Sequence, residues 1–412
     1  MLNKIKQNKQ LFSNFSYMFL IEIANYILPF LAIPYIVKTI GVTNFGIITF
    51  SYVVIAYFNL IVDYGFKLII IKDISRYRNS SQRLSFLFWK MYFSQFILLI
   101  ISILIFILIM QIPKFNEHIE VFIFAFGMVF GNILFPIWFF QGIEKMKYIA
   151  IFDFIARGLY VIAIFLIIHD KNDYIYVPLL NSLSFILIGV FSLLFIHYKF
   201  NINFVIPKFS QIKRFYKDGW HLFISSVSVN LYSNFNMILL GFMAGYTSVG
   251  IYSLAEKIFG AIVKTVGIIN VVLFPNFASI SSNKSLLVQK VKQVSKYYLI
   301  ILSIISLLLM SLSEFIIKLL FGDGHENSVL ILQILSLVLL FRPFGQLFTN
   351  YLVIKKMNKI VSKITFKTML FNIILVVPLI YFYHETGLVI TVLIAQVYQL
   401  FLNLKYNREI IK

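Results

Sequence analysis

The sequence predicts an all-α, polytopic membrane protein with about twelve transmembrane helices. Of its 412 residues, 60% are apolar and only 13% are charged, whereas an average soluble domain carries roughly 25% charged residues. The mean hydropathy is +0.89. A water-soluble fold of this length could not bury so much apolar surface, and a lipid solvent removes the need to bury it.

Apolar runs long enough to cross a membrane recur along the chain, since a spanning helix needs about 20 mostly apolar residues. The first six lie at about 11–37, 44–66, 86–111, 118–141, 148–169 and 174–198. Six more lie at about 219–243, 249–275, 297–320, 328–354, 362–383 and 385–405. Lys4, Lys6 and Lys9 precede the first run, which shows no small-residue cleavage site. We therefore expect a first membrane helix there rather than a signal peptide.

The basic residues that give the chain a net charge of +20 collect in alternate loops. They lie before the first run, after each even-numbered run and at the C-terminus, as at Arg76, Lys145, Lys208, Lys290 and Lys356. The intervening loops are short and partly acidic. This alternation is the positive-inside pattern, so we expect both termini in the cytoplasm. It also accounts for the charge without a nucleic-acid partner.

The chain divides into two halves that resemble each other weakly. The longest polar stretch separates an N-terminal six-helix bundle at 1–200 from a C-terminal one at 219–412, with a cytoplasmic linker at 201–218. Gly41-Val-Thr-Asn-Phe-Gly46 after the first run is echoed by Gly245-Tyr-Thr-Ser-Val-Gly250 after the seventh. Pro136 followed by Lys145-Met146 is echoed by Pro343 followed by Lys356-Met357. An even number of spans per half predicts a parallel repeat, and transporters built that way place the substrate path between the halves.

Three cations in the second half are the strongest candidates for a binding site. Lys257 and Lys264 lie seven residues apart in the eighth run, so they share one helix face. Glu256 can neutralise at most one of them. Arg342 lies near the middle of the tenth run. Charges at membrane depth usually face a cavity or a partner because they cost roughly 2.5–3.5 kcal/mol each. We predict a hydrated cavity that attracts anions.

Other polar residues inside the runs leave two interpretations open. Arg157 lies four residues after Asp153, which favours an ion pair on one helix, although Arg157 is also a candidate cation of the cavity. Glu22 and Asn25 in the first run, and Asn230 and Asn234 in the seventh, form stripes at helical spacing. These side chains either hydrogen-bond between helices or line the cavity, where Glu22 is a candidate for ion coupling.

The sequence lacks the patterns of several other functions. It contains no cysteine, no phosphate-binding loop, no dinucleotide fingerprint, no HExxH pattern and no histidine cluster. We expect no metal, no cofactor and no enzymatic activity.

Several segments resemble a known family. Pro136-Ile-Trp-Phe-Phe-Gln-Gly-Ile-Glu-Lys-Met-Lys147 looks like the signature after the fourth span of Wzx-type polysaccharide repeat-unit flippases. Pro34-Tyr-Ile-Val-Lys-Thr-Ile-Gly41, Asp63-Tyr-Gly-Phe66 and Lys72-Asp-Ile-Ser-Arg76 match further family segments. The likeness is specific from residue 11 to about 150 and vaguer beyond. The broader group is the multidrug/oligosaccharidyl-lipid/polysaccharide exporter superfamily, whose members have two six-helix bundles around a central cavity.

The resemblance implies a substrate and a location. A member of this family moves an undecaprenyl-pyrophosphate-linked oligosaccharide across the bacterial inner membrane, for O-antigen of lipopolysaccharide or for capsule. Its implied partners are that lipid-linked glycan, membrane lipids, a glycan polymerase and a chain-length regulator. The resemblance carries no site residue with it, so the site prediction rests on the lysines of the eighth run.

Three other functions stay open. A drug or cation antiporter of the same superfamily also has twelve spans, but cationic substrates favour an acidic cavity. Lipid II flippases resemble this chain too, although they typically carry two more helices. A membrane-embedded glycosyltransferase or glycan polymerase would act on the same lipid, but polymerases generally carry a large periplasmic loop, and the outer loops here are short.

Overall fold

The computed structural model describes residues 30–407, and its regular elements are helices. In that range nine helices are long and apolar enough to cross a membrane. The chain is therefore a multi-pass, all-helical membrane protein, as the composition predicts. Its contacts divide it into two compact units, Met1–Phe235 and Asn236–Lys412, which we call unit 1 and unit 2 and describe separately.

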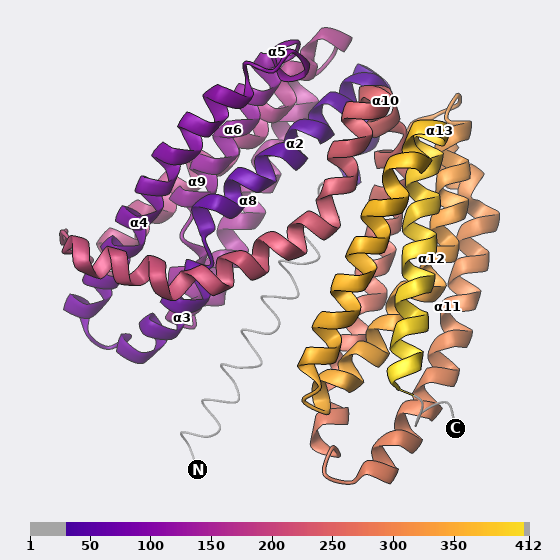
Figure 1. The fold of residues 1–412 in the computed structure, drawn as a ribbon. Coiled ribbons are helices and arrows are strands. Elements are labelled where there is room, and N and C mark those ends of the chain that lie inside the picture. The colour runs from indigo at the N-terminus through magenta and orange to yellow at the C-terminus, as the bar shows by residue number, and fades with distance from the viewer. Residues whose placement is uncertain (1–29, 408–412) are drawn as a thin grey trace. The chain divides into compact units, whose positions relative to one another are not determined.

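Unit 1 is a bundle of helices joined by short turns (Figure 1). A short apolar helix at Phe30–Ile40 comes first. It is followed by α2 (Val42–Asp63), α3 (Phe66–Tyr77), α4 (Ser81–Ile109), α5 (Pro113–Asn116), α6 (Ile119–Leu134), α7 (Ile137–Gly142), α8 (Met146–Ile167), the 3₁₀ helix η1 (Lys171–Ile175) and α9 (Tyr176–Phe200). The first part of α10 (Phe209–Ser279) completes the unit.

The tightest helix pair of unit 1 is α6 against α9, and small residues allow it. A Cβ added to Gly131 of α6 would lie 2.8 Å from the Cβ of Phe185, and one added to Gly189 of α9 would lie 2.6 Å from the Cβ of Leu134. Gly127 meets Ser182 in the same way at 2.8 Å. Lipid offers no hydrophobic drive for two helices to associate, so close backbone approach at small residues is what holds such pairs together.

Two features of unit 1 differ from the predicted spans. The fourth predicted run, 118–141, is interrupted between α6 and α7, because Phe135 precedes Pro136 and the ring keeps it out of helical geometry, with φ −95° and ψ 93°. The predicted linker 201–218 lacks regular secondary structure only over 202–208, and α10 begins at Phe209. The division of the chain into bundles at 1–200 and 219–412 stays a prediction.

Unit 2 holds the rest of α10, α11 (Lys284–Phe321), α12 (Glu326–Ile354) and α13 (Asn358–Tyr406), and α12 packs against both α11 and α13 (Figure 1). Two of these elements contain a non-helical residue. Gly245 breaks α10 with φ 89° and ψ 175°, and His384 breaks α13 with φ 49° and ψ −128°. Each is therefore two helices joined at a sharp turn.

The same backbone conformations recur at corresponding places in the two halves. Gly41 has φ 82° and ψ 165°, close to the values at Gly245. Positive φ also recurs at Glu144, with 58°, and at Lys356, with 59°. The next amide bonds back to the carbonyl five residues earlier in both places, at 2.9 Å. By backbone conformation Glu144 corresponds to Lys356, whereas the repeated Lys-Met dipeptide aligns Lys145 with Lys356. The turn geometry, rather than the dipeptide, is therefore what repeats.

Candidate functional site

The second helix of α10 carries both predicted lysines on one face. Lys257 and Lys264 are exposed, while Leu254, Ala255 and Ile258 beside them are buried. Seven residues correspond to about two helical turns, which aligns the two side chains. The structure thus directs both ammonium groups into space that the protein core does not fill.

Hydrogen bonds place Arg342 on the helix next to these lysines. Asn270 Nδ2 donates to the carbonyl oxygen of Pro343 at 3.4 Å, and Ser328 Oγ donates to that of Ile251 at 2.9 Å. Along α10, Ile251 precedes Asn270, and along α12 their partners follow in the same order. The two helices therefore run side by side in parallel. Arg342, which is exposed, directly precedes the bonded Pro343.

These contacts bring the three predicted cations of unit 2 onto one pair of helices. Asn270 lies six residues after Lys264, which is about 9 Å along the helix. Tyr252 lies within electrostatic reach of both Glu256 and Arg342. Glu256 lies beside these cations and Glu326 lies at the start of α12, so the helix pair carries three cations and two carboxylates and its net charge is positive.

Unit 1 holds the fourth candidate cation, Arg157, in an ion pair. Its Nε donates to Asp153 Oδ2 at 2.8 Å and one terminal nitrogen donates to Oδ1 at 3.2 Å. Asp153 is 8% exposed and Arg157 is 25% exposed. The guanidinium also lies 5.5 Å from the centre of the Phe185 ring. The predicted ion pair is confirmed, and its fork geometry satisfies both carboxylate oxygens.

We expect that Arg157→Ala lowers the stability of the protein more than Arg157→Ala combined with Asp153→Ala. The single change leaves a buried carboxylate unpaired, which costs roughly 2 kcal/mol after allowance for the exposed edge of the arginine. Thermal unfolding in detergent measures the difference. If the single variant were as stable as the double variant, the ion pair would not be what stabilises this part of unit 1.

A polar cluster near this ion pair was not found from the sequence. Asn181 of α9 donates to the hydroxyl of Tyr52 on α2 at 3.3 Å, and Tyr52 is hydrogen-bonded to Tyr160 of α8. Tyr160 lies about one turn after Arg157. Three helices thus meet at uncharged polar groups. In the sequence, Asn181 is a single asparagine in an apolar run, and this pattern does not identify its hydrogen-bond partners.

A second cluster joins the end of α2 to α6. Lys67 Nζ donates to Asp63 Oδ2 at 2.7 Å and to Asn132 Oδ1 at 3.4 Å, and Asn132 Nδ2 donates to Asp63 Oδ1 at 3.3 Å. The side chains of Asp63 and Lys67 are 27% and 34% exposed. The pair has the spacing of a helical ion pair, but Asn132, which closes the triangle, is far away in sequence.

The predicted polar stripes are described only in part. Asn234 donates to Asn230 Oδ1 at 3.2 Å, and Asn230 donates to the carbonyl oxygen of Ser226 at 3.0 Å, so both amides bond along their own helix. The Asn230 carbonyl oxygen also accepts from the hydroxyl of Tyr57 at 3.4 Å. Glu22 and Asn25 lie outside the described residues. Within residues 30–407, no three His, Asp or Glu side chains gather as metal ligands do.

The chain is similar to known proteins along most of its length. The model of the family described as "Polysaccharide biosynthesis protein" matches residues 11–281. A curated relative from Escherichia coli (strain K12), named "Putative O-antigen transporter", is 32% identical over 399 residues, which is 93% of each chain.

Two solved structures share the fold. A lipid II flippase, MurJ, in an inward closed conformation aligns with a TM-score of 0.72 and 16% identity over 95% of this chain and 87% of its own. An inward-facing multidrug resistance transporter of the MATE family, within the MOP superfamily, aligns with a TM-score of 0.63 and 14% identity over 93% of each chain. At this identity the likeness concerns the fold alone.

Proposed function

Because the chain belongs to the polysaccharide biosynthesis protein family, as the sequence resemblance predicted, we propose that it moves a lipid-linked oligosaccharide from one face of a membrane to the other. It is then a transporter and not an enzyme. The substrate is an undecaprenyl-pyrophosphate-linked repeat unit, moved across the bacterial inner membrane for O-antigen or capsule assembly. The observation that carries this proposal is the family match joined to a helix pair with three cations in unit 2.

The physical task explains why a protein is needed. A pyrophosphate with several sugars cannot enter hydrocarbon, because each charge loses its hydration. The polyprenyl chain is apolar and can remain in the hydrocarbon core. The protein therefore has to replace the hydration of the headgroup only.

The cationic helix pair of unit 2 supplies that replacement. Lys257, Lys264 and Arg342 present three positive groups to a headgroup that carries at least two negative charges. With the inside of the cell negative, each negative charge that moves outward gains about 2.3 kcal/mol per 100 mV. The membrane potential therefore drives part of the outward step.

We also propose the finer layout that the sequence predicts: twelve spans in two six-helix halves that repeat in parallel, with both termini cytoplasmic. The breaks at Gly245 and His384, which divide α10 and α13, support this count. The recurring turn conformations at Gly41 and Gly245 support the repeat.

The class of substrate is tested by ligand-induced stabilisation of the purified protein. A short-chain polyprenyl-pyrophosphate disaccharide at a hundred times its Kd should stabilise the folded state by about 2.7 kcal/mol, seen as a higher melting temperature. An organic cation of similar size should give no shift. Stabilisation by the cation alone would favour the drug exporter, a function whose fold this chain shares but whose substrates suit an acidic site.

A further inference from the structure

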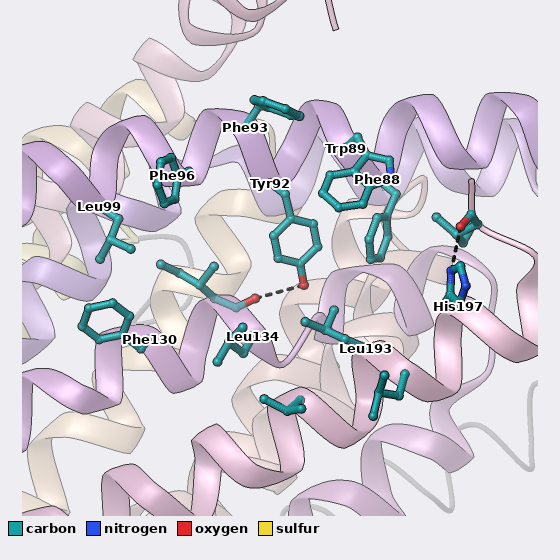
Figure 2. Close-up of a pocket in the computed structure, with 14 residues that line it drawn as sticks. Phe88, Trp89, Tyr92, Phe93, Phe96, Leu99, Phe130, Leu134, Leu193 and His197 are labelled. Atoms are coloured by element: carbon teal, nitrogen blue, oxygen red, sulfur yellow. Dashed lines mark hydrogen bonds between the residues drawn. The ribbon is translucent and has the colours of Figure 1, made fainter. Parts of the chain in front are cut away.

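A groove on unit 1 has no role in the proposal above. It has a volume of about 660 Å³ and lies between α4 and α9, with α6 as its floor (Figure 2). Its walls are almost entirely apolar. The lining residues are Phe88, Trp89, Tyr92, Phe93, Phe96 and Leu99 of α4, Phe130, Ile133 and Leu134 of α6, Val190, Leu193, Leu194 and His197 of α9, and Ile202.

The lining has few polar groups, and the hydroxyl of Tyr92 is hydrogen-bonded within it. The Tyr92 hydroxyl donates to the carbonyl oxygen of Ile133 at 3.1 Å, and the Trp89 ring lies edge-on to Phe204 with centroids 4.5 Å apart. The remaining polar group is His197 at one end (Figure 2). Its Nδ1 lies 3.1 Å from the carbonyl oxygen of Ile202. Since a carbonyl oxygen only accepts, this contact assigns a proton to Nδ1.

Basic side chains also lie near the end of the groove at His197. Ser81 Oγ donates to the carbonyl oxygen of Asn201 at 3.0 Å, and the amide of Asn203 donates to Ser85 Oγ at 3.0 Å. These bonds fix the chain after α9 against the first turns of α4, where Arg83 is exposed. On α9, Lys199 follows two residues after His197 and is exposed too, and its Nζ donates to the hydroxyl of Tyr148 on α8 at 2.6 Å. The groove thus has an apolar body with His197 at one end, and two basic side chains lie near that end, an arrangement that suits a lipid with an anionic headgroup.

The size of the groove favours a branched chain. From Phe88 to Leu99 it follows α4 for about 16 Å, roughly half the thickness of a 30 Å hydrocarbon core. A volume of about 660 Å³ over this length gives a mean cross-section of about 40 Å². An unbranched acyl chain is narrower and would lose wall contacts, whereas a chain with a methyl branch on every fourth backbone carbon fills the width.

We propose that this groove binds the polyprenyl chain of the lipid-linked substrate, with its phosphate at the His197 end. This inference rests on the proposed function for the identity of the lipid. The groove holds the chain within one leaflet, where the aromatic side chains of α4 contact its methyl branches and double bonds. The substrate is then concentrated on unit 1 before its headgroup moves.

The test uses the full-length protein in nanodiscs and a glycan-free polyprenyl phosphate that carries a photoreactive diazirine on its chain. After irradiation, mass spectrometry should place the label on groove residues of α4, α6 or α9. Leu194→Trp and Val190→Trp fill the groove and should each lower the labelling at least fivefold. Ile162→Trp is the matched control, because Ile162 lies on α8, which does not line the groove, and is 58% exposed, close to the 51% of Leu194. It should label like the wild type.

Competition identifies the lipid. Unlabelled polyprenyl phosphate should displace the probe, and dioleoyl phosphatidylglycerol at the same concentration should not. Equal displacement by the phospholipid, or a label outside the groove, would overturn the inference. Because the probe has no sugar and no transport is measured, labelling that survives a failure of glycan transport would leave the groove as a polyprenyl site and reject only the proposed function. Transport without groove labelling would reject the groove alone.

Discussion

Replacing Lys257 and Lys264 together by alanine should lower the initial rate of headgroup transport in proteoliposomes at least tenfold. Hydrogen bonds to charged groups contribute about 1.5–3 kcal/mol each, and every 1.4 kcal/mol is a factor of ten. Both side chains are exposed, so their removal creates no cavity in the core and the fold should persist.

A matched variant separates local from general effects of charge. Lys290→Ala with Lys292→Ala removes the same two charges from exposed positions near the start of α11, and it should transport like the wild type. Lys264→Arg should retain most of the activity because the charge is kept, while Lys264→Gln should not. Equal rates in both double variants and the wild type would exclude the two lysines from the mechanism.

Gly189→Ala and Gly158→Ala should change the stability of the protein in opposite directions. A Cβ at position 189 would lie 2.6 Å from the Cβ of Leu134 and 3.0 Å from its carbonyl carbon. Neither atom belongs to a flexible chain end, so α6 and α9 must separate, at a cost of about 1–3 kcal/mol. At position 158 nothing lies within 4 Å of the added Cβ, and alanine in a helix interior gains about 0.5–1 kcal/mol over glycine.

Thermal unfolding of the two variants in the same detergent measures this difference. The prediction requires a lower melting temperature for Gly189→Ala and a higher one for Gly158→Ala. If the two variants shifted in the same direction by similar amounts, the close contact between α6 and α9 would not be what stabilises unit 1.

The periodicity of apolar residues predicts the position of most helices, because each span must satisfy its backbone internally and present apolar side chains to lipid. It does not predict the interruption at Pro136 as a break between α6 and α7. It also does not identify α3 as a separate helix. The amphipathic α3 buries Phe66, Ile70 and Ile74 and is too short to cross a membrane, so the search for long runs passes over it.

The candidate site could be predicted only where it lies on one helix. Residues four or seven apart share a face, so the Asp153–Arg157 pair and the lysines of α10 follow from spacing. Partners on different helices cannot be predicted from spacing along the chain. Asn132 completes the cluster of Asp63 and Lys67 from 65 residues away, and Asn270 reaches Pro343 across 73 residues. Gly127 and Gly131 carry a spacing typical of close helix packing, but it does not say that α9 is the partner.

The central claim is that this protein moves the headgroup of a lipid-linked glycan. The direct measurement is leaflet exchange in liposomes that contain the purified protein and an undecaprenyl-pyrophosphate oligosaccharide with a fluorescent sugar. A membrane-impermeant quencher reports the fraction of headgroups on the outer face over time. We predict that quenching rises beyond the initial half only when the protein is present, and faster when an imposed potential draws negative charge outward. Exchange at the protein-free rate, with folded protein and under either sign of the potential, would contradict the account.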